Sequence, residues 1–509
     1  MIRVLLLIVL ALIAGGCTQQ RLMQSITPSE RITPAARDSK YLKAHMRDGQ
    51  VYIFSRWAVS ENGLVEGSGR QLNLERAEVH RGELSVPIDS VVIFESNQVT
   101  SNPAIAGLTL ITGASLATTM FCLINPKACF GSCPTFYASD GNEMVIQSEG
   151  FSSSVLPALE ARDIDALYHA RAMESPVHIK MTNEALETHV VRSVHLLAVP
   201  QEGDDRIFAT IDGEFWRAGQ TMAPFACLAP EGDCRSSLLM MDGKERFSVT
   251  DGRNLAAKEV LELTFEDIPA GRLGLVIGSR QTLLTTFLFY QGLAYLGQKM
   301  GSTFADLERN GIQMDHPLGS VGELLGGIEV HIQDDQGEWR VVGVDDETGP
   351  IATDVKIMPL PPMTPGRQKL RLRMTKGHVR LDYVALAVMD EQVQPIRLQP
   401  MRVEKAGATD EESLHSLMDP AQALVTLPGD SYTLTYELPQ TRGSYELFLE
   451  SQGYYLEWMR DVWLADENLR LARELFRKPE KALRRLAPEY KKIEASMEEV
   501  FWSSRYARP

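Results

Sequence analysis

The sequence predicts a mainly β protein with some α-helix: several small β-barrel or β-sandwich domains, one buried apolar helix and a C-terminal helical tail. Three observations support this prediction. Short runs with alternating apolar and polar residues recur along the chain, several of them beside Asp-Gly pairs, which favour hairpin turns. One uncharged apolar segment, 282–296, has the length of a buried helix. Apolar residues at helical spacing dominate only the end of the chain.

The first residues have the order of a signal peptide. After a charged start comes the apolar run Val4–Ile13, and then small residues directly before Cys17. The run is shorter than the roughly 20 residues that a membrane span needs. The segment resembles the lipobox of bacterial lipoproteins, although Ala14 stands where that family more often has Leu. The resemblance implies removal of residues 1–16 and lipidation of Cys17, which would anchor the chain to a membrane; an ordinary secretory peptide or an uncleaved anchor is the alternative.

Charge and the residue after the cysteine bear on location and partners. Thr18, not Asp, follows Cys17, which resembles the outer-membrane sorting pattern of lipoproteins in double-membraned bacteria. We therefore expect a protein of the cell envelope, at the outer membrane and facing the periplasm. The net charge of −16 becomes −17 once Arg3 leaves with the signal peptide. Without a strong basic cluster, nucleic acid is not an expected partner.

The chain has six cysteines. If Cys17 carries the lipid, five remain, so at least one cannot join a disulfide within the chain. An oxidising compartment favours short-range disulfides, and free buried thiols are the alternative. Cys122 lies in an apolar run and is expected to be a buried free thiol. The spacings are not those of paired zinc ligands, so no metal or other cofactor is predicted. The two predicted disulfides are Cys129–Cys133 and Cys227–Cys234.

The segment 104–124 is uncharged and long enough to cross a bilayer. Its serine and threonine residues dilute the hydrophobicity. If it crossed the inner membrane, the rest of the chain would lie in the cytoplasm, where the Cys227–Cys234 disulfide would not persist. A helix buried against the protein is therefore favoured, while a true span and a membrane-dipping helix remain open.

Composition and periodicity divide the mature chain into segments of different kinds. An early polar stretch with two prolines predicts a tether, and the β segments are separated by an apolar helix and an acidic linker. The expected order is a tether (17–37), a small β-barrel or roll (38–100), the apolar segment (104–124), a β-sandwich-like domain (130–280), a core helix (281–310), a jelly-roll-like domain (325–400), an acidic linker (401–422), a β-hairpin (423–452) and a helical tail (453–509).

A short motif opens the second β region. Cys133-Pro134 is followed by Tyr137 and then by Asp140-Gly141. This C-P-x-x-Y and D-G arrangement resembles a family of uncharacterised bacterial envelope proteins. The resemblance implies no catalytic assignment and no established function.

A search for chemistry finds few candidates, because none of the standard local signatures of catalysis is present. Period-two alternation predicts that His189 and His195 share one face of a strand, where either could meet a carboxylate. Solvated or structurally bonded histidines are the commoner explanation. The acidic groups at 334–335 and 345–347 lack the spacing of a calcium loop, so acidic turns are expected there.

One group of side chains suggests a sugar platform. Trp339 could supply an aromatic face, and Asp382 and Tyr383 could bind hydroxyl groups, although core positions are the default for such residues. The preferred prediction is a non-catalytic envelope lipoprotein that binds or scaffolds an envelope protein or glycan at the membrane surface. A carbohydrate-binding lipoprotein acting through Trp339 is the alternative, and a periplasmic hydrolase using His189 or His195 comes next.

Overall fold

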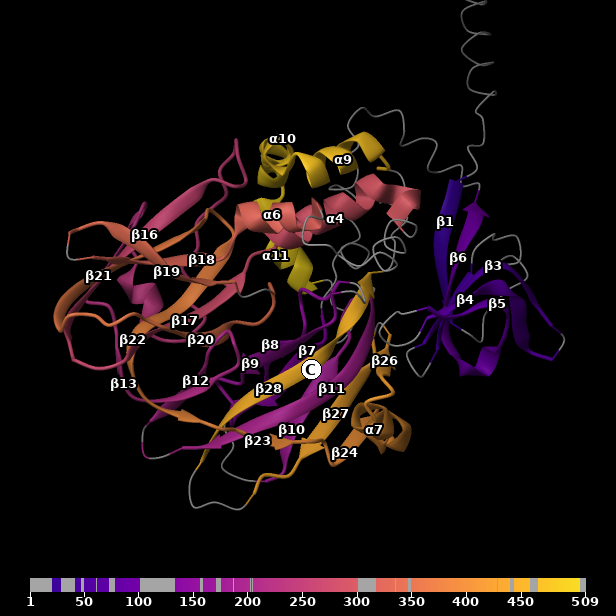
Figure 1. Ribbon diagram of the computed structural model, residues 1–509, viewed down its shortest axis with the longest axis horizontal. Helices are drawn as coiled ribbons and strands as arrows, with labels where there is room; N and C mark the ends of the chain where they lie inside the picture. The colour runs from indigo at the N-terminus through magenta and orange to yellow at the C-terminus, as the bar shows by residue number, and fades with distance from the viewer. Residues whose placement is uncertain are drawn as a thin grey trace, which may run out of the picture. The chain divides into compact units, whose positions relative to one another are not determined.

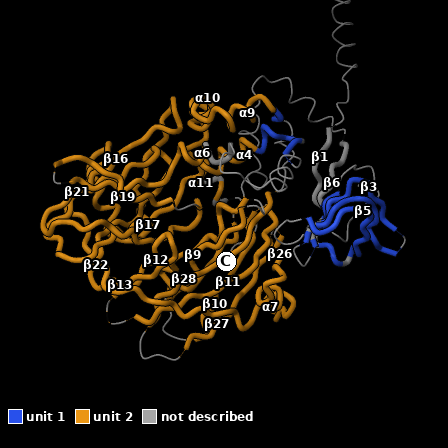
Figure 2. Tube along the Cα trace, in the orientation of Figure 1, with its two compact units in different colours: residues 1–124, 293–303, 459–468 blue, residues 125–292, 304–458, 469–509 orange. Residues whose placement is uncertain are grey.

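The computed structural model divides the chain into two compact units. Unit 1 comprises residues 1–124, 293–303 and 459–468, and unit 2 comprises all others (Figure 2). The signal peptide, Cys17 and the segment 104–124 lie outside the described residues. The structure describes residues 21–28, 42–46, 50–60, 62–72, 78–100, 133–155, 159–170, 175–185, 187–201, 203, 205–300, 317–334, 336–346, 349–427, 429–439, 444–457 and 466–503.

Unit 1 contains a six-stranded antiparallel sheet with the order β1-β6-β2-β3-β4-β5. Its first strand lies within the predicted tether 17–37, so that prediction is wrong for this part. The reason is long-range pairing with β6, which polar composition does not reveal. The expected barrel or roll is a sheet with β1 and β5 at its ends. The strands are β1 (Arg21–Pro28), β2 (Leu42–Met46), β3 (Val51–Val59), β4 (Leu64–Leu72), β5 (Glu78–Pro87) and β6 (Val91–Thr100), with the 3-10 helix η3 (Ile88–Ser90) before β6.

Apolar side chains from one face of this sheet form a small core around Leu42, Phe54 and Val65. A glycine is required where β4 passes β3 at a bulge. A Cβ on Gly67 would lie 2.0 Å from the carbonyl oxygen of Arg56. The close approach explains why a Gly-rich stretch forms a strand here.

Unit 2 begins with two sheets that face each other (Figure 1). Sheet B has the order β25-β24-β27-β10-β7-β8 and sheet C the order β23-β11-β28-β9, with β26 also paired to β11. Sheet B is formed by β7 (Thr135–Ser139), β8 (Met144–Glu149), β10 (Val177–Thr182), β24 (Arg402–Lys405), β25 (Ala408–Thr409) and β27 (Ser431–Tyr436). Sheet C is formed by β9 (Ala161–Ala166), β11 (Glu187–Pro200), β23 (Ile396–Leu398), β26 (Leu424–Thr426) and β28 (Tyr445–Glu457).

A closed barrel and a further sheet complete unit 2. The barrel has the order β12-β13-β22-β17-β20, and sheet E has the order β15-β14-β16-β21-β18-β19. The barrel is formed by β12 (Arg206–Ala209), β13 (Phe215–Met222), β17 (Leu273–Gln281), β20 (Asp354–Pro359) and β22 (Val379–Val393). Sheet E is formed by β14 (Ala226–Ala229), β15 (Gly232–Asp233), β16 (Lys258–Ile268), β18 (Ile328–Gln333), β19 (Trp339–Asp345) and β21 (Gly366–Thr375).

Three apolar cores join these layers. The first lies between sheets B and C, the second between sheet C and the barrel, and the third between the barrel and sheet E. Strand β28 contributes to two of them, because Leu447 and Leu449 point into the first core and Phe448 into the second. Each layer of unit 2 therefore packs against at least one other layer. The prediction of a mainly β protein is confirmed.

The sheets interleave segments that the sequence suggested were separate domains. Strand β7 belongs to the same sheet as β27, and β11 pairs with β28 over most of its length. The predicted boundaries near 280 and 400 therefore do not separate domains. The predicted hairpin over 423–452 is also wrong: β27 pairs with β10 and β24, whereas β28 pairs with β11 and β9. Alternation identifies strands but not their partners.

Residues 401–422 are not a linker. They form the hairpin β24–β25 and the helix α7 (Glu411–Met418). The carboxylate of Asp410 accepts the backbone N–H of Ser413 at 3.0 Å and so caps this helix. Two of the acidic residues of this segment, Glu411 and Glu412, lie in the first helical turn, where the helix dipole favours negative charge.

The predicted core helix forms as α4, and the helical tail begins later than expected. Residues 454–457 belong to β28, and α9 is the first helix of the tail among the described residues. Pro479 is the first residue of α10, whereas Pro488 lies inside that helix. The other helices among the described residues are α4 (Leu284–Leu296), α6 (Pro317–Leu325), α9 (Leu469–Arg477), α10 (Pro479–Lys491) and α11 (Glu494–Ser503), with the 3-10 helices η6 (Arg235–Leu238) and η7 (Gly297–Lys299).

Candidate functional site

The residues of the predicted sugar platform have separate surroundings. Trp339 begins β19, and the guanidinium carbon of Arg371 lies over its ring, 3.9 Å from the ring centre. Asp382 accepts a hydrogen bond at 3.1 Å from the backbone N–H of Gly243. The ring of Tyr383 packs against the core between sheet C and the barrel. The three side chains therefore do not form one platform, and Arg371 covers one face of the indole.

His189 and His195 lie on opposite faces of β11. A β-bulge after Val191 adds one residue, so the alternation changes phase between the two histidines. The expectation of one shared face is wrong because the sequence does not reveal this bulge. His189 Nε2 lies 3.2 Å from a carboxylate oxygen of Glu187, and His195 Nδ1 lies 3.4 Å from one of Glu450. Each histidine is thus a buried partner of a carboxylate.

Glu450 lies at the centre of a charged network on sheet C. Burial alone would raise its pKa, but hydrogen bonds from His195 and Arg397 and the charge of Arg162 lower the pKa to about 2. The guanidinium of Arg397 donates to Glu450 Oε1 at 2.9 Å. The carboxylate is therefore ionised and its hydrogen-bonding capacity is used within the protein, as expected for a structural group.

One predicted disulfide forms and the other does not. Cys227 and Cys234 are joined, with their Cα atoms 5.4 Å apart. Cys133 is a free, buried thiol, so the predicted Cys129–Cys133 disulfide is wrong; Cys129 and Cys122 lie outside the described residues. Burial raises the pKa of Cys133 well above its ordinary value. A buried, protonated thiol is unreactive, and Cys133 packs into the core between sheets B and C.

The acidic turns lack the arrangement of a cation site in the part of the chain that the structure describes. Asp334 Oδ1 accepts the backbone N–H groups of Gln336 and Glu338 at 3.0 and 2.9 Å, which fixes the β18–β19 turn. Asp345 is buried at the end of β19. Asp335 and Glu347 lie outside the described residues.

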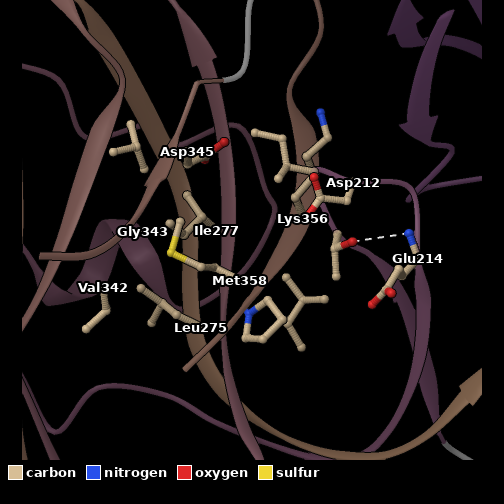
Figure 3. A pocket seen from close by; sticks show the side chains of 14 residues that line it. Asp212, Glu214, Leu275, Ile277, Val342, Gly343, Asp345, Lys356 and Met358 are labelled. Carbon is tan, nitrogen blue, oxygen red and sulfur yellow. Dashed lines mark hydrogen bonds between the residues drawn. The ribbon is translucent and has the colours of Figure 1, made fainter. Parts of the chain in front are cut away.

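A groove in unit 2 opens between the barrel and β19, the last strand of sheet E (Figure 3). It has a cavity volume of about 220 Å³. The β12–β13 turn, β17 and β20 form its barrel side, and residues 342–345 of β19 form the other. Four segments from distant parts of the sequence therefore build one surface.

The floor of the groove is apolar. Leu275 and Ile277 come from β17, Met358 from β20 and Val342 from β19. The Met358 sulfur lies beside Gly343, as Figure 3 shows. A Cβ on Gly343 would lie 2.4 Å from that sulfur, so glycine lets the methionine pack directly on the β19 backbone.

The rim of the groove is acidic. Asp212 and Glu214 belong to the β12–β13 turn and are exposed, whereas Asp345 on the opposite side is buried. Lys356 is the one basic residue of the lining, and its ammonium is 2.8 Å from Asp354. The groove thus combines an apolar floor with an excess of negative charge, which favours a cationic ligand.

Exposed aliphatic side chains border the same surface. Ile211 is 49% exposed and Val344 is 42% exposed. Neither residue, nor the carboxylates beside them, was among the predicted site residues. Only the Asp212-Gly213 turn carried a signal, and it indicated a hairpin, not a binding surface.

A buried carboxylate fixes the segment between β19 and β20, two strands of the groove. Glu149, at the end of β8, accepts the backbone N–H of Ile351 at 2.8 Å. Burial raises the pKa of Glu149 to about 7, although hydrogen bonds from the backbone and from the Cys133 thiol lower it. A titratable group of sheet B is thereby connected to the wall of the groove.

No helix among the described residues has the length and apolar character that a bilayer crossing requires. The segment 104–124 lies outside those residues, so its predicted role is untested.

Comparison with known proteins assigns no family. No family model matches the chain, and no curated protein matches it. Among solved structures, a match covers 73% of this chain and 86% of a chain in "Structure of infectious bursal disease virus Gx strain", with 12% sequence identity and a TM-score of 0.13. A superposition of this quality carries no argument about fold or function.

Proposed function

We propose that this protein is a non-catalytic lipoprotein of the cell envelope that binds or scaffolds another envelope component, and that the groove beside β19 is its contact surface. Lipid on Cys17 would hold the chain at the membrane, with the outer membrane as the proposed location. The observation that carries the proposal is the groove itself: an apolar floor with an acidic rim and exposed aliphatic borders, built by four segments of unit 2.

The groove suits a protein partner better than a small substrate. Pockets for small molecules typically have volumes of roughly 300–1,000 Å³ and enclose most of the ligand. The groove is smaller, at about 220 Å³, and none of its 14 lining residues is aromatic. Aromatic side chains are the usual surfaces on which sugars stack. The carbohydrate alternative also loses support from the separate surroundings of Trp339, Asp382 and Tyr383.

The hydrolase alternative would require a histidine between a nucleophile and an orienting carboxylate. His195 is bonded within the Glu450 network, and His189 is buried beside Glu187. Cys133 is buried, and its raised pKa keeps the thiol protonated. These environments support structural roles for His189 and His195, and they give the hydrolase alternative no reactive thiol at Cys133.

Site-specific photo-crosslinking in cells tests the proposed contact surface. A photoreactive amino acid at Val344 should capture a partner from the envelope, whereas the same amino acid at Met401, 56% exposed and outside the groove lining, should not. Equal capture at both positions, or none at Val344, would refute the groove as the contact surface.

Metabolic labelling tests the membrane anchor separately. A fatty-acid analogue should label the wild-type chain, and Cys17→Ser should be unlabelled and leave the membrane fraction or remain unprocessed, because its hydroxyl cannot form the thioether. Equal labelling of the two proteins would contradict the lipid assignment.

A further inference from the structure

We infer that the groove binds an extended, basic polypeptide segment that pairs as an added strand with the outer edge of β19. The inference rests on the proposed function and names the class of partner. Three features carry it: the place of β19 in its sheet, the aliphatic side chains beside it, and the charge of the rim.

Strand β19 ends the order of sheet E and has β18 as its one neighbour among the described strands. Its other edge therefore carries backbone N–H and C=O groups without a strand partner in that part of the chain. Such an edge is a template for strand addition, in which main-chain hydrogen bonds supply affinity. A bulge between Val341 and Gly343 interrupts the pairing with β18, and residues 343–345 beyond it line the groove.

The side chains beside this edge are those of a contact surface. Val341 and Val344 are 53% and 42% exposed, and Ile211 on the facing turn is 49% exposed. In an added strand, alternate side chains point to opposite faces. Apolar side chains of one face would enter the cavity above Met358 and Leu275, which at about 220 Å³ accommodates about one or two side chains.

The rim selects for positive charge. Asp212 and Glu214 contribute two exposed carboxylates to the lining, and Lys356 is already paired with Asp354. Neither carboxylate has an ion-pair partner within the described part of the chain, although Glu214 accepts a hydrogen bond at 3.2 Å from the indole N–H of Trp216. Lysine or arginine side chains of an added strand could reach them from its outer face. Charge complementarity of this kind increases association rates and excludes acidic competitors.

Binding of a defined probe to the purified full-length chain tests the inference. The probe is a fluorescent peptide of alternating lysine and valine; its controls are the glutamate–valine counterpart and a lysine–valine peptide with N-methyl groups on alternate backbone nitrogens. We expect binding of the first peptide only, with affinity that falls as salt increases. Equal binding of the glutamate peptide would overturn the charge argument, and equal binding of the methylated peptide would overturn strand addition.

A matched pair of variants tests the position of the probe. Asp212→Asn with Glu214→Gln should weaken binding by about tenfold. Glu411→Gln with Glu437→Gln, which neutralises two exposed carboxylates outside the groove lining, should leave binding unchanged. Amide exchange should slow in β19 and not in β23 when the probe binds, since only β19 would gain hydrogen bonds. Unchanged exchange in β19 would refute the inference.

The outcomes separate this inference from the proposed function. Crosslinking through Val344 in cells could capture a partner whose contact segment is acidic or helical. That result would overturn the inference of a basic, extended partner, while the groove would remain the contact surface. Absence of any capture at Val344 would refute the proposed function itself.

Discussion

Strands β28 and β19 belong to the same unit but have opposite environments. β28 lies between β11 and β9, and its side chains enter two apolar cores from opposite faces. β19 has one strand neighbour among the described residues, and Val341 on it is 53% exposed. Strand β28 is thus packed on both faces and paired along both edges, whereas β19 is the last strand of its sheet and lies beside the groove.

The comparison shows that reactive residue types are a poor guide to function in this chain. His195 of β11 pairs with Glu450 of β28, and His189 pairs with Glu187 on its own strand. Burial in a central sheet makes unpaired polar groups costly, so pairing there is a requirement of folding. The groove beside β19 has no such pairs, but it offers unfilled volume and a backbone edge without a strand partner among the described residues. Incomplete packing is therefore the better indicator of a binding surface in this chain.

The largest predicted effect concerns Phe448 of β28. Its ring contacts that of Phe215 with centroids 4.9 Å apart and lies between sheet C and the barrel. Phe448→Ala should lower the free energy of unfolding of unit 2 by about 4 kcal/mol, because it leaves a cavity in a core that cannot collapse easily. Denaturant unfolding measures this loss. A change below about 1 kcal/mol would contradict the central role of β28.

The second prediction concerns Glu149, which connects sheet B to the groove. Burial raises its folded pKa to about 7, above the ordinary value of 4.5, so the unfolded chain releases this proton at lower pH than the folded chain. Its contribution to stability therefore falls as pH rises from 4.5 to 7, by about 3 kcal/mol. Glu149→Gln should accordingly stabilise the protein above pH 7 and change little below pH 4.5.

Unfolding measured for both proteins at each pH isolates this effect from other groups. His378, for example, has its pKa lowered to about 4 by burial, and its contribution cancels in the comparison. Glu437→Gln at an exposed position is the control and should remain within about 0.5 kcal/mol of wild type at either pH. A Glu149→Gln effect without pH dependence would show that titration of this carboxyl is not the cause.

The third prediction concerns the charged network of β28. The pKa of Glu450 is lowered to about 2, so its stabilising effect is present above pH 4.5 and is lost as pH falls toward 2. Glu450→Gln should cost roughly 2 kcal/mol at pH 7, since the hydrogen bonds to charged partners weaken. The cost should shrink at pH 3 and below. A cost that does not depend on pH would indicate packing instead of charge.

Local features of the fold were predictable from the sequence. The mainly β class, the buried helix α4 and the Cys227–Cys234 disulfide follow from alternation, apolar length and cysteine spacing, all of which are local patterns. Pro479 begins α10 because proline fits the first helical turn.

Long-range features were not predictable. Neither the pairing of β11 with β28 nor the bulge after Val191 has a local signature, and both decide where the histidines point. The groove residues are ordinary turn and strand residues, such as Asp212 and Val344, that the fold brings together from four segments. A surface of this kind becomes visible only when the strand order is known.

The smallest predicted effect on stability concerns Val344, and it sharpens the contrast between the two strands. Its side chain is 42% exposed, so Val344→Ala should change the free energy of unfolding by less than about 0.5 kcal/mol. An added strand would bury the two methyl groups that the substitution removes, so affinity for the lysine–valine probe should fall about fivefold. Val249→Ala, at a valine 61% exposed and outside the groove lining, should change neither quantity. Denaturant unfolding and probe binding of these variants measure the two quantities. If Val344→Ala lost as much stability as a substitution of a core valine, β19 would be packed as tightly as β28, and the contrast between the two strands would be wrong.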